Sequence, residues 1–122
     1  MKPFSPFLDQ DIDQDIKPLC NAINSHEDMV TLGSCSGHGN KSAYIDIAIK
    51  GKRGIKKLIK IINSISEKED SIWLDVLLNW NETIVTSCDF VSYPDWVMYH
   101  LSIGTDNIPP TSEELIFIAS EF

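Results

Sequence analysis

Residues 29–49 read MVTLGSCSGHGNKSAYIDIAI, and this stretch decides the fold. From Tyr44 to Ile49 the side chains alternate, so that three isoleucines share one face, as in a half-buried strand. Residues 29–34 are also typical of a strand, and the segment between the two strands holds Gly37 and Gly39, which interrupt regular structure. The stretch therefore predicts a β-hairpin with a glycine-rich loop over residues 35–40.

Helices are predicted on both sides of this hairpin and near the C-terminus. Apolar side chains over residues 11–25 recur at the spacing of one helical face. Pro18 lies inside this segment, so either the helix is kinked there or it begins near Lys17 with Pro18 at its first position. After Gly51 a second apolar stripe faces away from a row of basic residues, and Thr111 with a glutamate three positions later forms the capping box of a third helix.

The second half of the chain predicts three further strands. Residues 72–78 and 82–88 flank a turn at Asn79, Trp80 and Asn81 and predict a second hairpin, while residues 96–103 carry apolar side chains at alternate positions. The element order is αββαβββα. We therefore expect an α+β fold, a two-layer sandwich of a mostly antiparallel sheet with helices on one face, in a single domain over residues 1–122.

Composition limits the classes of function. The chain has 18 acidic and 10 basic residues and a formal net charge of −8, which disfavours binding to nucleic acid by charge alone. The N-terminus, broken by Pro3 and Pro6, lacks the apolar segment of a signal peptide, and no apolar run approaches the ~18 residues of a membrane span. Three cysteines without paired spacing favour a reducing compartment. We expect a soluble, cytoplasmic protein that does not contact a membrane.

The loop of the first hairpin is the candidate site. It brings hydroxyls, a thiol, an imidazole and glycines into a few residues, as no other segment does. Glycines let backbone N–H groups converge on an anion or let a ligand approach closely, and histidine readily moves a proton near neutral pH. The competing interpretation is a structural glycine-rich turn. The predicted ligand-binding residues are Ser34, Cys35, Ser36, Gly37, His38, Gly39 and Asn40.

The chemistry of the cysteines stays open. His38 follows Cys35 by three positions, which suits an activated thiolate if both side chains point the same way. Adding Cys88 and His100 gives four zinc-type ligands, but their spacing lacks the close pairing typical of zinc sites, so no metal is assigned. Cys20, on the apolar face of the first helix, and Cys88, at a strand end, are expected in the core. The residues assign no cofactor and leave enzyme activity open.

Basic and aromatic side chains offer further contacts. The basic row of the second helix is typical of a solvated face, and its alternative role is contact with a phosphate-bearing ligand. The tryptophans are able to stack on a base, although one of them is expected in the core. The basic residues are Lys50, Lys52, Arg53, Lys56, Lys57 and Lys60, and the tryptophans are Trp73, Trp80 and Trp96.

The helix, strand and Ser-Cys-Ser-Gly loop between Leu19 and Asp46 resemble the N-terminal part of the methyltransferase family that acts in wybutosine synthesis on phenylalanine tRNA. That family usually has a basic residue after Ser-Gly, where this sequence has His38, and its later cofactor-binding segments have no match here. The chain is more closely similar to small uncharacterised bacterial and phage proteins with a Cys-Gly-His-Gly type loop, a resemblance that implies no activity. The first resemblance implies a shared loop formed by Ser34, Cys35, Ser36 and Gly37.

Two hypotheses follow from different classes of function. The first is a small ligand-binding domain whose site is the loop of residues 34–40 and whose ligand is a small molecule, a nucleotide or a nucleoside-like compound. The second is a small acidic interaction protein of the immunity or inhibitor type, in which the net charge of −8 steers association with a basic protein partner and the loop is only structural.

Overall fold

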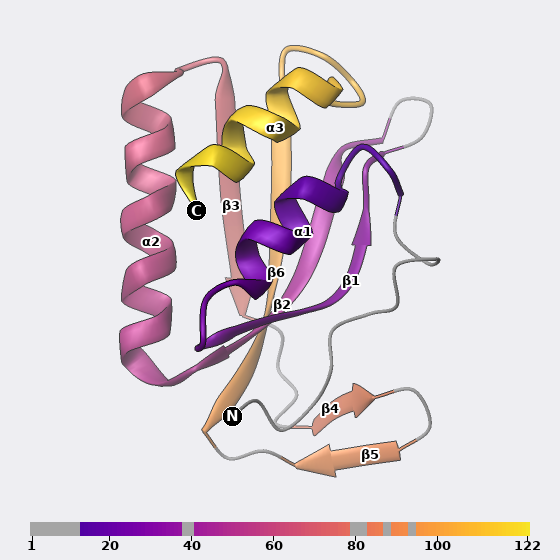
Figure 1. The fold of residues 1–122 in the computed structure, drawn as a ribbon, viewed down its shortest axis with the longest axis vertical. Coiled ribbons are helices and arrows are strands. Elements are labelled where there is room, and N and C mark those ends of the chain that lie inside the picture. Colours follow the sequence, from indigo (N-terminus) through magenta and orange to yellow (C-terminus); the bar gives the residue numbers. More distant parts are fainter. Residues whose placement is uncertain (1–12, 38–40, 79–82, 87–88, 93–94) are drawn as a thin grey trace.

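The computed structural model describes residues 13–37, 41–78, 83–86, 89–92 and 95–122. Its larger sheet has four strands in the order β1-β2-β6-β3, and every neighbouring pair is antiparallel. Strands β4 and β5 form a separate two-stranded sheet at one end of the molecule (Figure 1). In chain order the elements are α1 (Lys17–Asn24), β1 (Met29–Cys35), β2 (Ala43–Lys50), α2 (Gly51–Lys68), β3 (Ile72–Leu78), β4 (Thr83–Thr86), β5 (Asp89–Ser92), β6 (Trp96–Thr105) and α3 (Ser112–Glu121).

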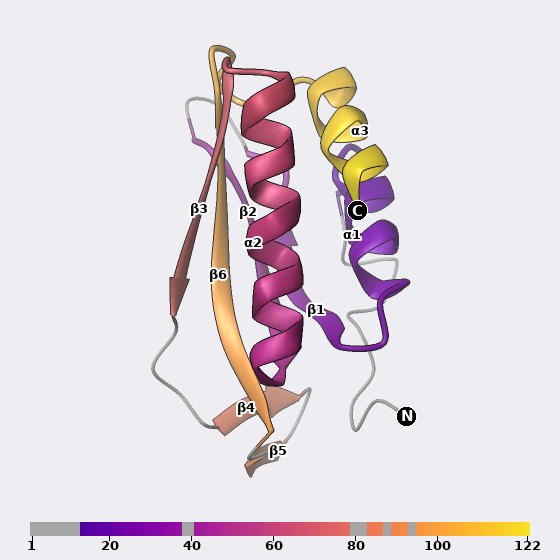
Figure 2. The same ribbon diagram turned by 90° about the vertical axis from the view of Figure 1, so that its left-hand side faces the viewer.

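The helices lie on one face of the larger sheet. Figure 2 shows α1, α2 and α3 together on one side of β3 and β6, in a second layer. This arrangement confirms the predicted α+β sandwich with a mostly antiparallel sheet. The observed order, αββαββββα, has one strand more than the sequence predicted, because residues 89–92 form β5.

The first hairpin is confirmed, with longer strands than predicted. β1 and β2 pair in antiparallel register from Met29 opposite Ile49 to Cys35 opposite Tyr44, and the register shifts between Thr31 and Gly33. Residue 35, predicted in the loop, therefore belongs to β1, as residue 34 was predicted to. Their backbones continue the ladder because the glycines that interrupt regular structure come only at positions 37 and 39.

The second predicted hairpin is wrong. β3 pairs with β6, with Leu74 opposite Ile103 and Val76 opposite Leu101, and β4 pairs with β5 instead. The physical reason is apolar matching, since each of these two pairs sets side chains of the core opposite one another. The predicted turn at Asn79, Trp80 and Asn81 lies outside the described residues.

The helix boundaries follow from their capping residues. α1 begins at Lys17 with Pro18 in its first turn, so the alternative without a kink is the correct one. α3 begins after Thr111, whose hydroxyl accepts a hydrogen bond from the backbone N–H of Glu114 at 3.2 Å. The Glu114 carboxylate accepts one in return from the backbone N–H of Thr111 at 2.8 Å, which completes the predicted capping box.

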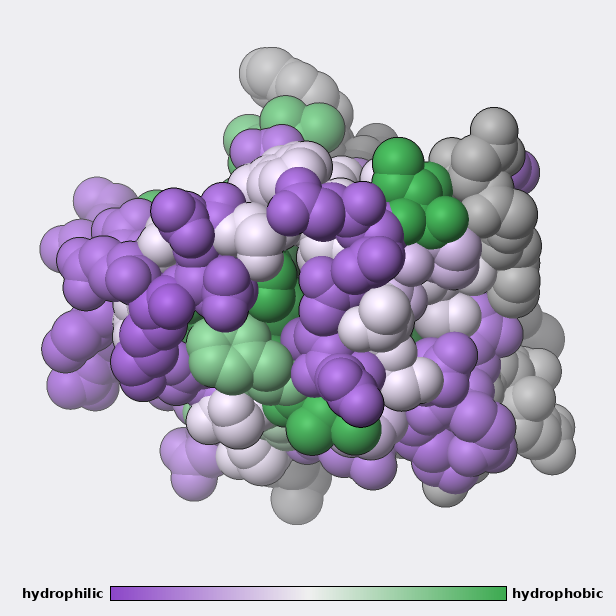
Figure 3. Space-filling view, turned by 90° about the horizontal axis from the view of Figure 1, so that it is seen from above, coloured by the Kyte–Doolittle hydropathy of each residue, from purple (hydrophilic) through white to green (hydrophobic). Residues whose placement is uncertain are grey.

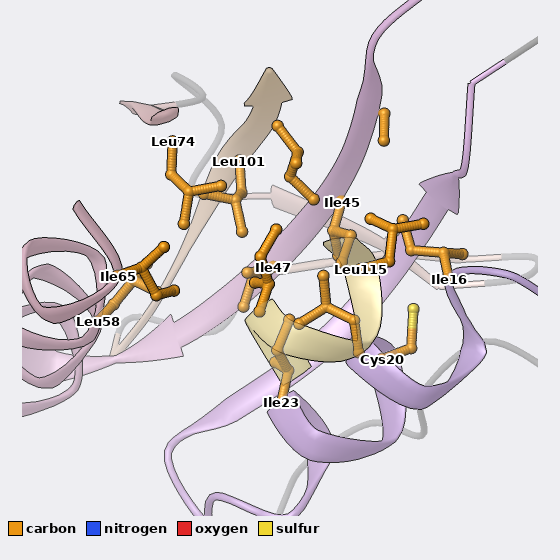
Figure 4. Packing of buried hydrophobic residues seen from close by; sticks show 14 of the residues in the cluster. Ile16, Cys20, Ile23, Ile45, Ile47, Leu58, Ile65, Leu74, Leu101 and Leu115 are labelled. Carbon is orange, nitrogen blue, oxygen red and sulfur yellow. The ribbon is translucent and has the colours of Figure 1, made fainter. Parts of the chain in front are cut away.

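Apolar side chains gather between the two layers. Where β3 and α3 begin, the surface is mainly hydrophilic (Figure 3), whereas the interior between sheet and helices is closely packed (Figure 4). A second, smaller buried cluster of Val30, Ala48 and Trp96 lies on the opposite face of the sheet. The main cluster joins strand residues Ile45, Ile47, Leu74 and Leu101 to helix residues Cys20, Ile23, Leu58, Ile65 and Leu115, which confirms the core position predicted for Cys20.

Candidate functional site

The last residues of β1 do not point to one place. Ser34 stands opposite Ile45, a core residue, and its hydroxyl hydrogen-bonds the buried thiol of Cys20. Burial raises the pKa of the Cys20 thiol, and the hydrogen bond with Ser34 opposes that shift. Cys35 stands opposite Tyr44 on the other face of the sheet and is half-buried. Ser34 and Cys35 therefore serve different faces.

Ser36 is tied to the segment that precedes α1. Its backbone N–H and its hydroxyl both donate to Oδ2 of Asp13, at 3.0 and 3.1 Å, and Ser36 is 8% exposed. A buried hydroxyl needs such a partner, and here the chain itself supplies it. Ser36 thus joins the end of the hairpin to the entrance of α1.

Gly37 is required by the packing of the chain. Its φ is +93°, in a region of backbone conformation that residues other than glycine rarely adopt. A Cβ atom at this position would lie 2.5 Å from the carbonyl oxygen of Lys41 and 2.7 Å from Cβ of Pro109. The space beside Gly37 is therefore filled by the protein itself, by the backbone of Lys41 and by Pro109 in the segment before α3, and not by a ligand.

The remaining loop residues, His38, Gly39 and Asn40, lie outside the described residues, as does Cys88. Cys35 and His100 are on β1 and β6, which are separated by β2. Within the part of the chain that the structure describes, no three potential ligands lie close enough together to hold a metal ion.

The face of the sheet opposite the helices, here called the open face, carries a cluster that begins beside Cys35. Alternation along β2 directs Tyr44 and Asp46 to this face, because Ile45 and Ile47 between and beside them enter the core. His100 of β6 stands opposite Asp46 in the ladder. We call Tyr44, Asp46 and His100 the open-face cluster.

Hydrogen bonding fixes the orientation of the histidine in this cluster. Nδ1 of His100 lies 2.7 Å from Oδ1 of Asp46, and the two side chains are 35% and 29% exposed. A carboxylate only accepts, so Nδ1 carries the hydrogen in this bond. The ring of Tyr44 stacks on that of His100, with centroids 5.1 Å apart and planes inclined by 28°. The result is a pre-oriented imidazole with a neighbouring aromatic ring, both in contact with solvent.

A tryptophan extends the aromatic surface toward β3. Trp73 stands opposite Gly104 of β6, and its indole lies so close to that glycine that a Cβ atom would overlap the ring. Trp73 remains 49% exposed. Ser102, two residues before Gly104, stands opposite both Tyr44 and Asp75, so polar groups lie between the aromatic side chains.

Tyr44 and Asp46 were missed as site residues by the sequence prediction. The alternation that placed the isoleucines in the core also placed these two residues on the opposite face, and that was the available signal. Their partner His100 is about one-third exposed, and its separation of 54 residues from Asp46 hid the pair.

A hollow lies between α3 and the start of β3, with a volume of about 480 Å³. The Glu114 carboxylate at its edge accepts hydrogen bonds from Thr105 at 3.1 Å and Asn107 at 3.2 Å as well as from Thr111. These bonds hold the start of α3, so the polar groups here serve the fold. The lining residues are Glu69, Ser71, Ile72, Asn107, Thr111, Glu113, Glu114 and Phe117.

The basic residues and the tryptophans singled out from the sequence differ in their surroundings. Lys57 forms an ion pair with Asp28 at 3.0 Å, while the basic residues at 52, 53, 56 and 60 on α2 are exposed, in keeping with a solvated face. Trp96 is buried, with 5% of its surface exposed, and Trp80 lies outside the described residues. Of the helices that are described, none has both the length and the apolar character needed to cross a membrane.

Comparison with known proteins gives a partial match to a protein family. The family model for methyltransferase TYW3 matches residues 8–39, about a quarter of the chain. The matched segment includes α1, β1 and the Ser-Cys-Ser-Gly sequence, which confirms the resemblance predicted over a short N-terminal segment, although the match ends before β2. No curated protein matches the chain, and no solved structure does. The similarity to small bacterial and phage proteins stays a prediction.

Proposed function

We propose that this domain binds a small, planar, nucleoside-like ligand on the open face of its sheet, at the side where the first hairpin ends. The predicted loop site is thereby enlarged by the open-face cluster. Cys35 forms its edge on β1, and His38 to Asn40 continue from there along the chain. Neither methyl transfer nor any other reaction is part of the proposal.

The observation that carries the proposal is the stacked pair of Tyr44 and His100 with its hydrogen bond to Asp46. Exposed aromatic rings on a sheet are a usual platform for bases, because every base presents a π-face. Nε2 of His100 would supply a polar contact to the edge of the bound base. Trp73, half exposed two strands away from β2, extends the apolar area available to a ligand.

The partial family match supports the same region. Residues 8–39 include β1, the strand that borders the cluster, and Gly33 on that strand lies next to Asp46, whose Oδ2 would be 3.7 Å from an added Cβ atom. The family model carries the name of a methyltransferase, but the match covers too little of the chain to transfer that activity.

A thermal-shift panel of nucleosides, nucleotides, adenosylmethionine and tRNA tests the proposal. A ligand with dissociation constant Kd raises stability by RT ln(1 + [L]/Kd), about 2.7 kcal/mol at a hundredfold excess over Kd. Tyr44→Ala and His100→Ala should remove the shift. His26→Ala is the matched control, because His26 bonds the Phe122 carbonyl at 2.7 Å on the helix side. Absence of a shift with every compound contradicts the proposal.

The second candidate is a small acidic protein that binds a basic protein partner, favoured by the net charge of −8. Its test is association that weakens steeply as salt rises, measured on a co-purified basic partner. Binding of a nucleoside at the cluster together with no such partner would favour the first candidate.

A further inference from the structure

We propose that the outer edge of β3 receives an extended, basic segment of a partner protein as an added strand of the sheet. This inference does not depend on ligand binding at the open-face cluster. It gives the second candidate function a defined contact surface.

The position of β3 supplies the backbone groups for such a contact. β3 is the last strand in the order β1-β2-β6-β3, and among the described strands it pairs only with β6. Figure 2 looks onto this side of the molecule, where no described element runs along the outer edge of β3. Every second N–H and C=O group of an edge strand points away from the sheet and is available to an incoming strand.

The side chains of β3 suit binding rather than protection. Edge strands are usually protected by charged side chains, prolines or bulges. Of these features β3 has only the single charge of Asp75, and its register with β6 is regular over seven residue pairs. Three of its large apolar side chains are instead strongly exposed. They are Trp73 at 49%, Leu77 at 62% and Leu78 at 50%.

The negative charge on β3 and on the whole chain indicates that the partner segment is basic. Asp75 is exposed at the centre of β3, between Trp73 and Leu77 on the open face. A second copy that paired antiparallel with all seven residues would place its own Asp75 directly opposite, and like charges in that position are destabilising. Two chains of net charge −8 also repel each other. The complementary strand has a basic side chain opposite Asp75 with apolar side chains on both sides of it.

A synthetic peptide of that pattern provides the probe. The acetylated and amidated peptide Thr-Val-Thr-Lys-Thr-Val-Thr reads the same in both directions, so it sets lysine opposite Asp75 in either orientation. The control peptide has glutamate in place of lysine. Binding is followed by chemical shifts and hydrogen exchange of the backbone amides of the full chain. We expect slowed exchange at alternate amides of β3, and binding of the glutamate peptide about three- to tenfold weaker.

The variant Asp75→Lys tests the charge, and it should fold because Asp75 is exposed. It should reverse the order of the two peptides. Equal binding of both peptides, protection outside β3, or no protection at all overturns the proposal, as does concentration-dependent self-association that protects β3 without peptide. A nucleoside titration reports on Tyr44 and His100 instead, so failure of one proposal is distinguishable from failure of the other.

Discussion

Nδ1 of His100 and Oδ1 of Asp46 lie 2.7 Å apart between directly opposed residues of β2 and β6. The ring orientation of His100 is thus set by the protein before any ligand arrives. Both side chains remain about one-third exposed, so solvent weakens the contribution of the pair to stability. We therefore expect the pair to matter more for binding than for folding.

Substitution of this pair should have little effect on stability. His100→Ala or Asp46→Ala should lower the free energy of unfolding by no more than about 1 kcal/mol, as for other cross-strand pairs on an exposed face. Urea denaturation of each variant and of the double variant measures the effect. A loss above about 2 kcal/mol in either single variant would assign the pair to the fold instead.

His38→Ala addresses the part of the predicted site that lies outside the described residues. If His38 belongs to the ligand site, stability should change by less than about 0.5 kcal/mol while binding is lost. If the ring serves the hairpin, the loss should be about 1–3 kcal/mol through an unsatisfied partner. Denaturant melts combined with the ligand panel separate these results, and a loss above about 2 kcal/mol removes His38 from the site.

Gly37→Ala should destabilise the chain by more than about 1 kcal/mol, since it adds strain at a positive φ and overlap with Lys41 and Pro109. Gly33→Ala is the matched control in the same hairpin. Its added Cβ meets only Oδ2 of Asp46, at the ordinary contact distance of 3.7 Å. Thermal melts of the two variants should differ clearly, and equal melting temperatures would refute the close packing of Gly37.

Glu114 should make stability depend on pH in the acid range. Burial alone raises the pKa of this carboxyl, but hydrogen bonds from Thr111, Asn107 and Thr105 outweigh it and hold the pKa below the ordinary value. Because the folded state has the lower pKa, the contribution is present above about pH 4.5 and is lost as pH falls through the folded-state value.

Glu114→Gln should remove this pH-dependent contribution and lower stability at pH 7 by about 0.3–1 kcal/mol, the usual value of a negative charge in the first turn of a helix, because glutamine can still accept the capping-box hydrogen bond. Urea melts from pH 7 to pH 3 compare the variant with the natural chain. Exposed Glu113→Gln is the control, and an unchanged pH profile in Glu114→Gln would contradict the assignment.

The local fold was predictable because its signals are local. The isoleucine alternation of β2, the proline at the start of α1 and the capping box at Thr111 each depend on neighbouring residues. The partner of β3 was not predictable from proximity in the chain. β3 pairs with β6, 18 or more residues further along the chain, because Leu74 and Val76 meet core residues there. Turn residues in the sequence do not predict a pairing over such a distance.

The candidate site was predictable only at its edge. Small and reactive residues drew attention to the hairpin loop, but two of them were already committed to the fold, Ser36 to Asp13 and Gly37 to its close packing. The open-face cluster joins residues from β2 and β6 that are far apart in sequence. Only the antiparallel register brings Asp46 and His100 together.

A side-chain NMR titration tests the central claim most directly. Resonances of the Tyr44 and His100 rings are followed while adenosine, guanosine, cytidine and uridine are added to the full chain, with His26 as an internal reference on the helix side. The account predicts saturable shifts of both rings with at least one nucleoside and no shift of His26. Unchanged Tyr44 and His100 resonances with all four nucleosides, or shifts shared equally by His26, would contradict it.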